Sequence, residues 1–159
     1  MADKNKTNVM RLCDANQINY KIHNYTNNPS TNGEEIAFIL GQDPNRVFKT
    51  LVTVGKSGEH YVFVVPVCDS LDLKKAAKSV GEKSIEMIKQ KELLPLTGYV
   101  HGGCSPIGMK KFFKTTVHET ADNFETIFFS AGRIGYQVEM NIEELKKVIK
   151  INLCDITEF

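Results

Sequence analysis

The feature that most constrains this fold is a pair of β-rich, largely apolar runs, residues 47–54 and residues 60–67. They are joined by the short polar sequence GKSGE at residues 55–59. Two such runs with a glycine-containing connection of five residues predict an antiparallel β-hairpin. We therefore expect a hairpin in the first half of the chain.

Four amphipathic helices are expected around this hairpin, because apolar residues recur at helical spacing after a residue that can cap a helix. The expected helices begin after Thr7, Thr31, Asp72 and Asn141. Thr31 and Glu34 have the spacing of a capping box. Gly41 and Gly81 are suitable C-terminal stops for the second and third helices.

Shorter β-rich runs separate these helices, at residues 20–25, 99–101, 112–118, 127–130 and 136–140. Helices and strands do not follow a regular βαβ order. The pattern therefore predicts an α+β fold, with a mixed, mainly antiparallel, curved or barrel-like sheet and helices packed around it. The 159 residues contain no repeat, low-complexity tract or Pro/Gly/Ser-rich linker, so we expect a single domain over residues 1–159.

The chain shows no sign of a membrane or secreted protein. Its most apolar run, residues 61–68, is far shorter than the roughly 18 residues of a membrane span. No apolar signal core follows the polar N-terminus. The four cysteines are scattered without a CxxC motif, which favours the reducing cytoplasm over a disulfide framework.

Charge is balanced overall and uneven along the chain. The formal net charge is +1, which excludes a uniformly basic nucleic-acid-binding surface. Residues 70–114 contain nine lysines and four acidic residues, a local balance of +5. Lysines in this region could contact the phosphates of a nucleic acid, or could simply form a solvated helix face. The candidates are Lys74, Lys75, Lys78, Lys110 and Lys111.

Lys49 is the first candidate for a functional side chain, since it is the only charge within residues 47–54. Strand alternation places it on the same face as Val47 and Leu51. A lysine buried there would need a partner. The alternative is that its aliphatic stem lies on apolar surface while its ammonium group reaches water.

A glycine-rich loop is the second candidate, in the sequence TGYVHGGCSPIG at residues 97–108. Gly102 and Gly103 would let the backbone approach a ligand closely and present N–H groups to an oxygen atom. The loop departs from the nucleophile elbow G-x-S-x-G and from the P-loop. His101 and Cys104 have half the spacing of a zinc site, or could pair as thiolate and imidazole. A purely structural turn remains an alternative.

The third candidate is residues 128–135, a β-rich run that ends in a turn where Gly132 precedes Arg133 and Gly135 follows it. Such a turn can aim Ser130 and Arg133 at a ligand. A surface turn with a solvated arginine is the alternative.

Together these segments resemble the YbaK/EbsC family of free-standing aminoacyl-tRNA deacylases. The resemblance rests on VFKTL at residues 47–51, LDLKKAAK at 71–78, GYVHGGCSPIG at 98–108 and SAGR at 130–133, in that order. It covers nearly the whole chain and extends to the editing domain inserted in bacterial prolyl-tRNA synthetases.

The resemblance implies that the protein removes cysteine from mischarged tRNA(Pro), with prolyl-tRNA synthetase as a partner. Small pockets distinguish poorly between side chains of similar size, so such errors are corrected at a second site. In the implied reaction the thiol of the bound cysteine attacks its own ester carbonyl, which releases a cyclic thiolactone and free tRNA. No metal or cofactor is implied.

The resemblance also assigns residues. Lys49 and Gly102 match the family's catalytic positions. The expected substrate-binding residues are Tyr25, Thr50, Gly103, Ser105, Ser130 and Arg133. Some relatives carry an acidic residue where this chain has Gln137, and the sequence KTLV at residues 49–52 favours the cysteine-editing group over an alanine-editing one. A module that binds tRNA or a partner without catalysis is the alternative.

Overall fold

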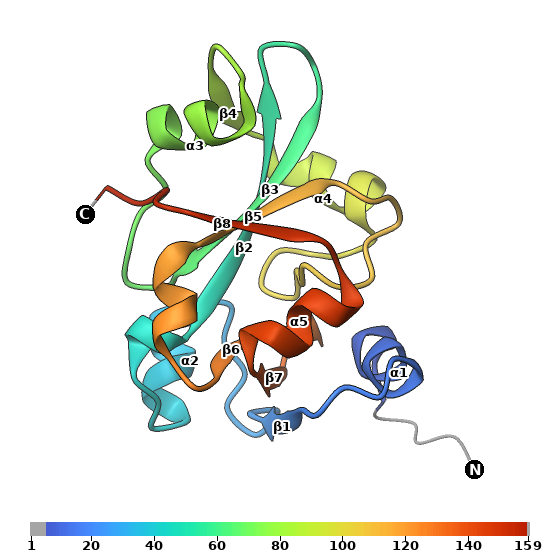
Figure 1. Ribbon diagram of the computed structural model, residues 1–159. Coiled ribbons are helices and arrows are strands. Elements are labelled where there is room, and N and C mark those ends of the chain that lie inside the picture. Colours follow the sequence, from blue (N-terminus) through green and yellow to red (C-terminus); the bar gives the residue numbers. More distant parts are fainter. Residues whose placement is uncertain (1–5, 159) are drawn as a thin grey trace.

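The computed structural model describes residues 6–158 (Figure 1). Its helices are α1 (Asn8–Ala15), α2 (Gly33–Ile39), α3 (Leu73–Val80), α4 (Gln90–Thr97) and α5 (Ile142–Val148), with 3-10 turns η1 (Pro44–Arg46) and η2 (Glu119–Asn123). Its strands are β1 (Lys21–Asn24), β2 (Phe48–Gly55), β3 (His60–Pro66), β4 (Ile85–Met87), β5 (Lys114–His118), β6 (Ile127–Arg133), β7 (Tyr136–Met140) and β8 (Ile151–Cys154). None of the described helices is long and apolar enough to cross a membrane.

The strands form two sheets. A five-stranded sheet has the order β4-β2-β3-β5-β8, and a three-stranded sheet has the order β1-β7-β6. Pairing is antiparallel except for β3 with β5 and β5 with β8, so the mixed, mainly antiparallel arrangement is confirmed. Figure 1 shows the three-stranded sheet at one end of the molecule and α3 with β4 at the other.

The sheets are not closed into a barrel, which corrects the barrel-like form that the sequence left open. Among the described residues, a single parallel bridge joins Val47, the residue before β2, to Phe128 of β6. Alternating burial predicts which face of a strand packs inward, but it does not say which strands become neighbours.

The core lies mainly between the two sheets. Val62 and Val64 of β3 face Phe129 of β6 and residues of α1 and α5 in the larger hydrophobic cluster. The intervening residues of β3, among them Phe63, pack with Ala76 and Ala77 of α3 on the other face of the sheet. Because successive side chains point to opposite faces, both sides of β3 are buried.

The predicted helix starts are confirmed at three of four places. The side chains of Thr7, Asp72 and Asn141 each accept a hydrogen bond from a backbone N–H in the first turn of their helix. At α2 the cap is Asn32, whose side chain accepts from the N–H of Glu35. The prediction of Thr31 as the cap was wrong by one residue, since Asn is at least as good an N-cap as Thr.

The hairpin of β2 and β3 is confirmed, with Phe48 opposite Pro66 and Val54 opposite His60. The predicted strand at residues 99–101 was wrong. Gly98 (φ +87°) and Gly102 (φ +87°) flank this segment in left-handed conformations that a strand does not adopt. Helix α4 was missed because Pro95 lies inside it and a proline normally argues against a helix interior.

Candidate active site

A cavity of about 170 Å³ lies where β2, β6 and β7 meet helix α2 and the glycine-rich loop. Strand β4 pairs only with Thr53, Val54 and Gly55 of β2. The start of β2 therefore forms a sheet edge without a neighbouring strand beyond the bridge of Val47 to β6 in the described part of the chain. Residues 47–51 of this edge all line the cavity. Side chains alternate between the two faces of a strand. Consecutive residues can nevertheless line the cavity here, because the cavity lies along the open edge of the strand.

Two adjacent residues of β2 that line this cavity carry polar groups without partners in the described part of the chain. Lys49 is half-buried and makes no ion pair with any residue in the range 6–158. The hydroxyl oxygen of Thr50 is buried and has no hydrogen-bond partner within the described structure. A buried hydroxyl without a partner destabilises a fold by about 1–3 kcal/mol. Lys49 is therefore available to a bound ligand, whereas the hydroxyl oxygen of Thr50 is covered by the surrounding protein.

The glycine-rich loop contributes backbone at Gly102. A Cβ atom at this position would lie 2.5 Å from Cγ2 of Thr31, and the φ angle of +87° is one that L side chains rarely adopt. Gly102 and Thr31 both line the cavity. The loop thus approaches the segment before α2 at a distance that excludes any side chain, and it exposes peptide groups to the cavity.

The opposite wall comes from β6 and β7. Ser130 pairs with Gln137 in the register, and a bulge follows between Ser130 and Arg133. The side chain of Gln137 is 3% exposed and forms a reciprocal pair with Gln42, with N–H···O distances of 2.7 and 3.0 Å. Ser130 Oγ accepts a hydrogen bond from the N–H of Gly132 (3.0 Å). Bulges of this kind re-aim side chains beside active sites.

Tyr25 and Cys104 also line the cavity. Burial raises the pKa of the Tyr25 hydroxyl, and burial raises the pKa of the Cys104 thiol to about 12. Both groups are therefore protonated at neutral pH. A cysteine nucleophile needs a depressed pKa, so the environment of Cys104 does not favour a thiolate–imidazole pair with His101.

The charge of the cavity is one-sided. Among the described residues that line it there is no aspartate or glutamate, and Lys49 is the one lysine or arginine. No group of three or more His, Cys, Asp or Glu residues suited to a metal ion occurs within residues 6–158. The cavity is suited to binding a group that carries or develops negative charge.

The structure brings together five of the eight residues expected to act on the substrate: Tyr25, Lys49, Thr50, Gly102 and Ser130. Gly103 lies outside the lining, packed against the backbone of Arg133 and Ile134. Ser105 is fully buried, and its Oγ accepts from the N–H of Ile107 (3.3 Å). Arg133 is exposed, with its guanidinium carbon 5.7 Å from the centre of the Tyr136 ring.

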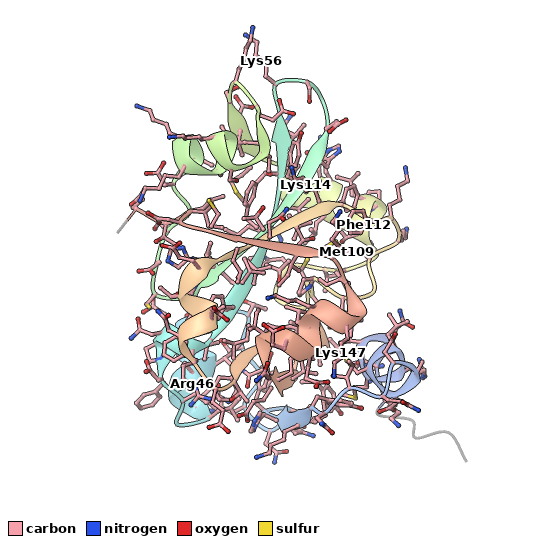
Figure 2. The ribbon with its side chains drawn as sticks, in the orientation of Figure 1. Arg46, Lys56, Met109, Phe112, Lys114 and Lys147 are labelled. Carbon is pink, nitrogen blue, oxygen red and sulfur yellow. The ribbon has the colours of Figure 1, made fainter. Side chains whose placement is uncertain are left out.

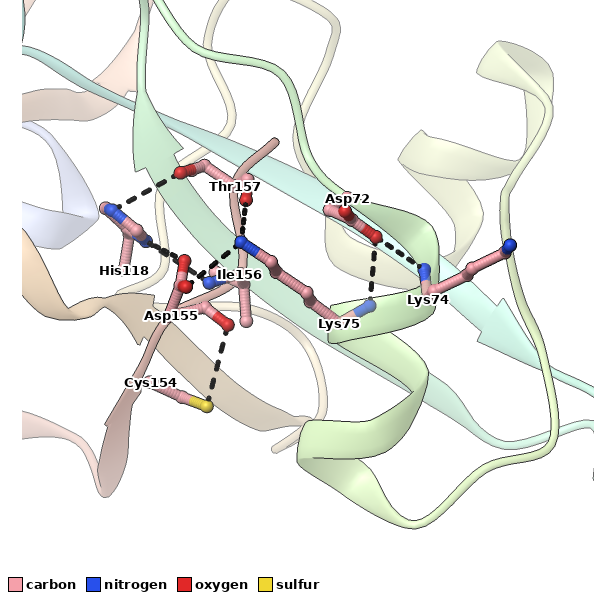
Figure 3. A network of polar contacts seen from close by, with 8 residues as sticks. All are labelled: Asp72, Lys74, Lys75, His118, Cys154, Asp155, Ile156 and Thr157. Carbon is pink, nitrogen blue, oxygen red and sulfur yellow. Dashed lines mark hydrogen bonds and ion pairs between the residues drawn. The ribbon is translucent and has the colours of Figure 1, made fainter. Parts of the chain in front are cut away.

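The five candidate tRNA-binding lysines differ in their surroundings. Lys74, Lys78, Lys110 and Lys111 are exposed. Lys75 instead enters a polar network at the end of the chain, shown in Figure 3. Its ammonium group donates to Asp155 Oδ2 (3.0 Å) and to the carbonyl of Thr157 (2.8 Å). Lys75 therefore ties α3 to the segment after β8.

Several lining residues were not predicted as site residues, notably Thr31, Leu93 and Gln137. Leu93 belongs to the missed helix α4. Thr31 was interpreted as a helix cap, and only the close approach of Gly102 shows its second role. The pair of Gln42 and Gln137 joins residues 95 positions apart, and no local pattern signals such a contact.

Comparison with known proteins places this arrangement in a family. The model of the aminoacyl-tRNA editing domain matches residues 27–148. A protein of Enterococcus faecalis that carries the name Cys-tRNA(Pro)/Cys-tRNA(Cys) deacylase EbsC is 41% identical over 153 residues, which cover 96% of this chain and 93% of that protein.

Solved structures share the fold. The crystal structure of APE2540 has a TM-score of 0.87 at 21% identity and covers 94% of this chain and 99% of its own. A crystal structure described as a trans-editing enzyme for prolyl-tRNA synthetase has a TM-score of 0.83 at 21% identity, with complete coverage of both chains. The chain therefore belongs to the aminoacyl-tRNA editing domain family, the family of deacylases that its motifs predict.

Proposed function

We propose that this protein removes cysteine from mischarged tRNA(Pro), and that the thiol of the bound cysteine is the nucleophile. The observation that carries the proposal is a small cavity in which Lys49 has no ion-pair partner among residues 6–158 and the one lining cysteine is not activated as a nucleophile. The name of the Enterococcus faecalis relative, at 41% identity, supports the choice of cysteine and of tRNA(Pro).

The volume of the cavity supports a small amino acid. About 170 Å³ is several times the ~30 Å³ that a water molecule occupies in the liquid, and less than the ~300 Å³ at which drug-sized pockets begin. A small aminoacyl group would fit in such a space. The terminal adenosine would lie at the mouth of the cavity, and the rest of the tRNA outside it.

The proposed reaction needs one nucleophile and one place for negative charge. The substrate thiol loses its proton to solvent, its sulfur bonds to the ester carbonyl carbon, and the bond from that carbon to the ribose oxygen breaks. The ribose oxygen takes up a proton, so the products are a cysteine thiolactone and free tRNA. Lys49 would stabilise the negative charge that develops on the carbonyl oxygen, and Gly102 would position the ester.

The thiol of the bound cysteine is a better nucleophile than the protonated thiol of Cys104. A free thiol has a pKa near 8.5 and is partly thiolate at neutral pH, more so beside a lysine. The Cys104 thiol, with a pKa of about 12, would be a far weaker source of thiolate.

Mischarged tRNA would come from prolyl-tRNA synthetase, so this protein would act in trans on that enzyme's product, in the cytoplasm. The exposed lysines Lys74, Lys78, Lys110 and Lys111 would contact tRNA phosphates. The internal contacts of Lys75 favour a structural role for that side chain instead.

The decisive experiment is single-turnover deacylation of tRNA(Pro) carrying radiolabelled cysteine or serine, by the wild type and by Cys104→Ala. We expect rapid release of cysteine by both proteins and slow release of serine, because a hydroxyl is far less nucleophilic than a thiol at neutral pH. Loss of activity in Cys104→Ala, together with normal cleavage of the serine ester, would replace this mechanism by one that uses the protein thiol. No release of cysteine by the wild type would leave a binding module without catalysis.

A further inference from the structure

Phe112 is an exposed aromatic side chain that the core does not use. It is 68% exposed and lies in the loop that follows the glycine-rich segment, before β5. Two surface hollows share it as a wall. One, of about 230 Å³, is lined by Leu12, Met109 and their neighbours, and the other, of about 450 Å³, by His60, Lys114 and theirs. Figure 2 shows Phe112, Met109 and Lys114 close together in the view.

Three lysines lie within two residues of Phe112 in the chain, and two of them, Lys111 and Lys114, each line one of the hollows that Phe112 lines. Lys110, Lys111 and Lys114 are exposed, and none of them forms an ion pair with any described residue. Glu59 is the one acidic residue that lines either hollow in the described part of the chain. An exposed aromatic face among unpaired lysines has the chemistry that binds single-stranded nucleic acid, with a base on the ring and phosphates on the cations.

We propose that Lys110, Lys111, Phe112 and Lys114 form a platform on which an unpaired base near the 3′ end of the tRNA stacks. The inference rests on the proposed function in one respect, that the substrate is an aminoacyl-tRNA. It adds a stacking residue and a direction in which the RNA leaves the cavity.

The chain connects this platform to the cavity. The N–H of Lys110 donates to the carbonyl of Thr97 (3.1 Å), and its side chain packs against Gly98. Three residues beyond Gly98, His101 lines the cavity. Three residues of extended chain span at most about 10 Å. RNA that leaves the cavity at His101 can therefore reach Lys110 and then Phe112 along this segment.

A protein partner would also cover an exposed aromatic ring, but the charges favour RNA. Three unpaired lysines against one glutamate match a polyanion, and charge complementarity of this kind steers nucleic-acid association. We therefore expect RNA to bind this surface, and the experiment below distinguishes RNA from a protein partner.

The test compares Phe112→Ala with Phe112→Trp, and uses Phe38→Ala as a matched control. Phe38 is 87% exposed on α2, two residues from the cavity-lining Ile36 and so about 200° around the helix from it. Binding of uncharged tRNA(Pro) is measured by fluorescence anisotropy at several salt concentrations. A second readout is the emission of 2-aminopurine placed at successive unpaired positions of the 3′ end.

We expect Phe112→Ala to weaken tRNA binding about tenfold, within the range for loss of one base stack. Phe112→Trp should restore binding, and Phe38→Ala should leave it unchanged. The slope of affinity against salt should stay the same in Phe112→Ala and become shallower in the double variant Lys110→Gln/Lys111→Gln, because only the lysines release counterions. One 2-aminopurine position should lose its quenching in Phe112→Ala.

Wild-type affinity and unchanged 2-aminopurine emission in Phe112→Ala would overturn the proposal. Wild-type RNA binding with lost binding to prolyl-tRNA synthetase would also overturn it, in favour of a protein-docking surface. Because uncharged tRNA is the probe, these results do not depend on which amino acid is removed. Failure of the proposed function would appear separately, as no cysteine release by the wild type.

Discussion

The polar groups around Lys49 and those around His118 are arranged in opposite ways. In the network of Figure 3, the N–H of Ile156 donates to Nδ1 of His118 (3.2 Å), and Nε2 of the same ring lies 3.4 Å from Thr157 Oγ1. Lys75 completes the network through Asp155. In the cavity, the ammonium of Lys49 and the hydroxyl of Thr50 have no such partners among the described residues.

This difference distinguishes a lysine that stabilises the fold, Lys75, from one that can bind a ligand, Lys49. A buried or half-buried polar group normally finds a partner in the fold, because leaving it unpaired is destabilising. The network around His118 follows this rule except at Asp155 Oδ1, which has no hydrogen bond among the described residues and lies 3.9 Å from His118 Nδ1. The network holds the segment after β8 against α3 and β5. Two adjacent residues of the cavity, Lys49 and Thr50, depart from the rule within the described structure, and a ligand in the cavity would supply a partner for Lys49.

The largest effect is expected from removing the ammonium group of Lys49 in the cavity. Lys49→Ala should lower single-turnover deacylation of Cys-tRNA(Pro) at least about tenfold, the equivalent of losing ~1.4 kcal/mol of transition-state stabilisation. Lys49→Arg should not restore it, because a planar guanidinium does not replace a compact ammonium in a small cavity. Lys56→Ala, at the exposed turn between β2 and β3, is the control. Turnover near that of the wild type in Lys49→Ala would rule out this role.

A second prediction concerns two threonines of β2 that differ in pairing. Thr50→Val removes a buried hydroxyl without a partner and should raise the free energy of unfolding by about 1 kcal/mol while deacylation falls. Thr53→Val removes a hydroxyl that donates to the carbonyl of Tyr61 (2.9 Å), and should lower it by about the same amount. Urea denaturation of both variants gives the two signs. The same sign in both would show that the pairing of the hydroxyl is not what matters.

The third prediction compares Lys75, whose ammonium group has partners in the fold, with the exposed Lys74 of the same helix. Lys75→Met should lower the free energy of unfolding by up to about 1 kcal/mol, the range for a partly exposed ion pair, and leave the salt dependence of tRNA binding unchanged. Lys74→Met, on the same helix and exposed, should leave the free energy of unfolding unchanged and make the salt dependence of tRNA binding shallower. A shallower salt slope in Lys75→Met would place tRNA phosphates on that side chain after all.

The smallest expected effect is a dependence of stability on pH. Burial lowers the pKa of His118, and Asp155 offsets part of this. The unfolded chain therefore binds more protons than the folded one as the pH falls through about 6.5, so the free energy of unfolding should decrease there. His118→Asn removes the titrating group. Denaturation curves between pH 5 and pH 8 should be flatter for this variant, and parallel curves for both proteins would contradict the prediction.

The local features of this fold could be predicted from the sequence because they depend on neighbouring residues. Thr7, Asp72 and Asn141 begin helices since their side chains accept N–H groups two or three residues ahead. Gly81 ends α3 in a left-handed conformation. The β2–β3 hairpin follows from two apolar runs and their short connection. The order of its motifs likewise predicted the family.

The cavity depended on tertiary structure, because its walls come from segments that are distant in sequence. Whether strands form one sheet or two depends on which edges meet, and alternation of apolar residues is the same in both cases. Sequence alone predicted Lys49, Gly102 and Ser130 as separate candidates. These residues come to one cavity only through tertiary contacts: the packing of Thr31 beside Gly102, the pairing of Gln42 with Gln137 and the open edge of β2. Tertiary structure also decides which lysines are engaged in the fold. Lys75 meets Asp155, 80 positions further along the chain, while Lys49 has no ion-pair partner within residues 6–158 and can bind a ligand.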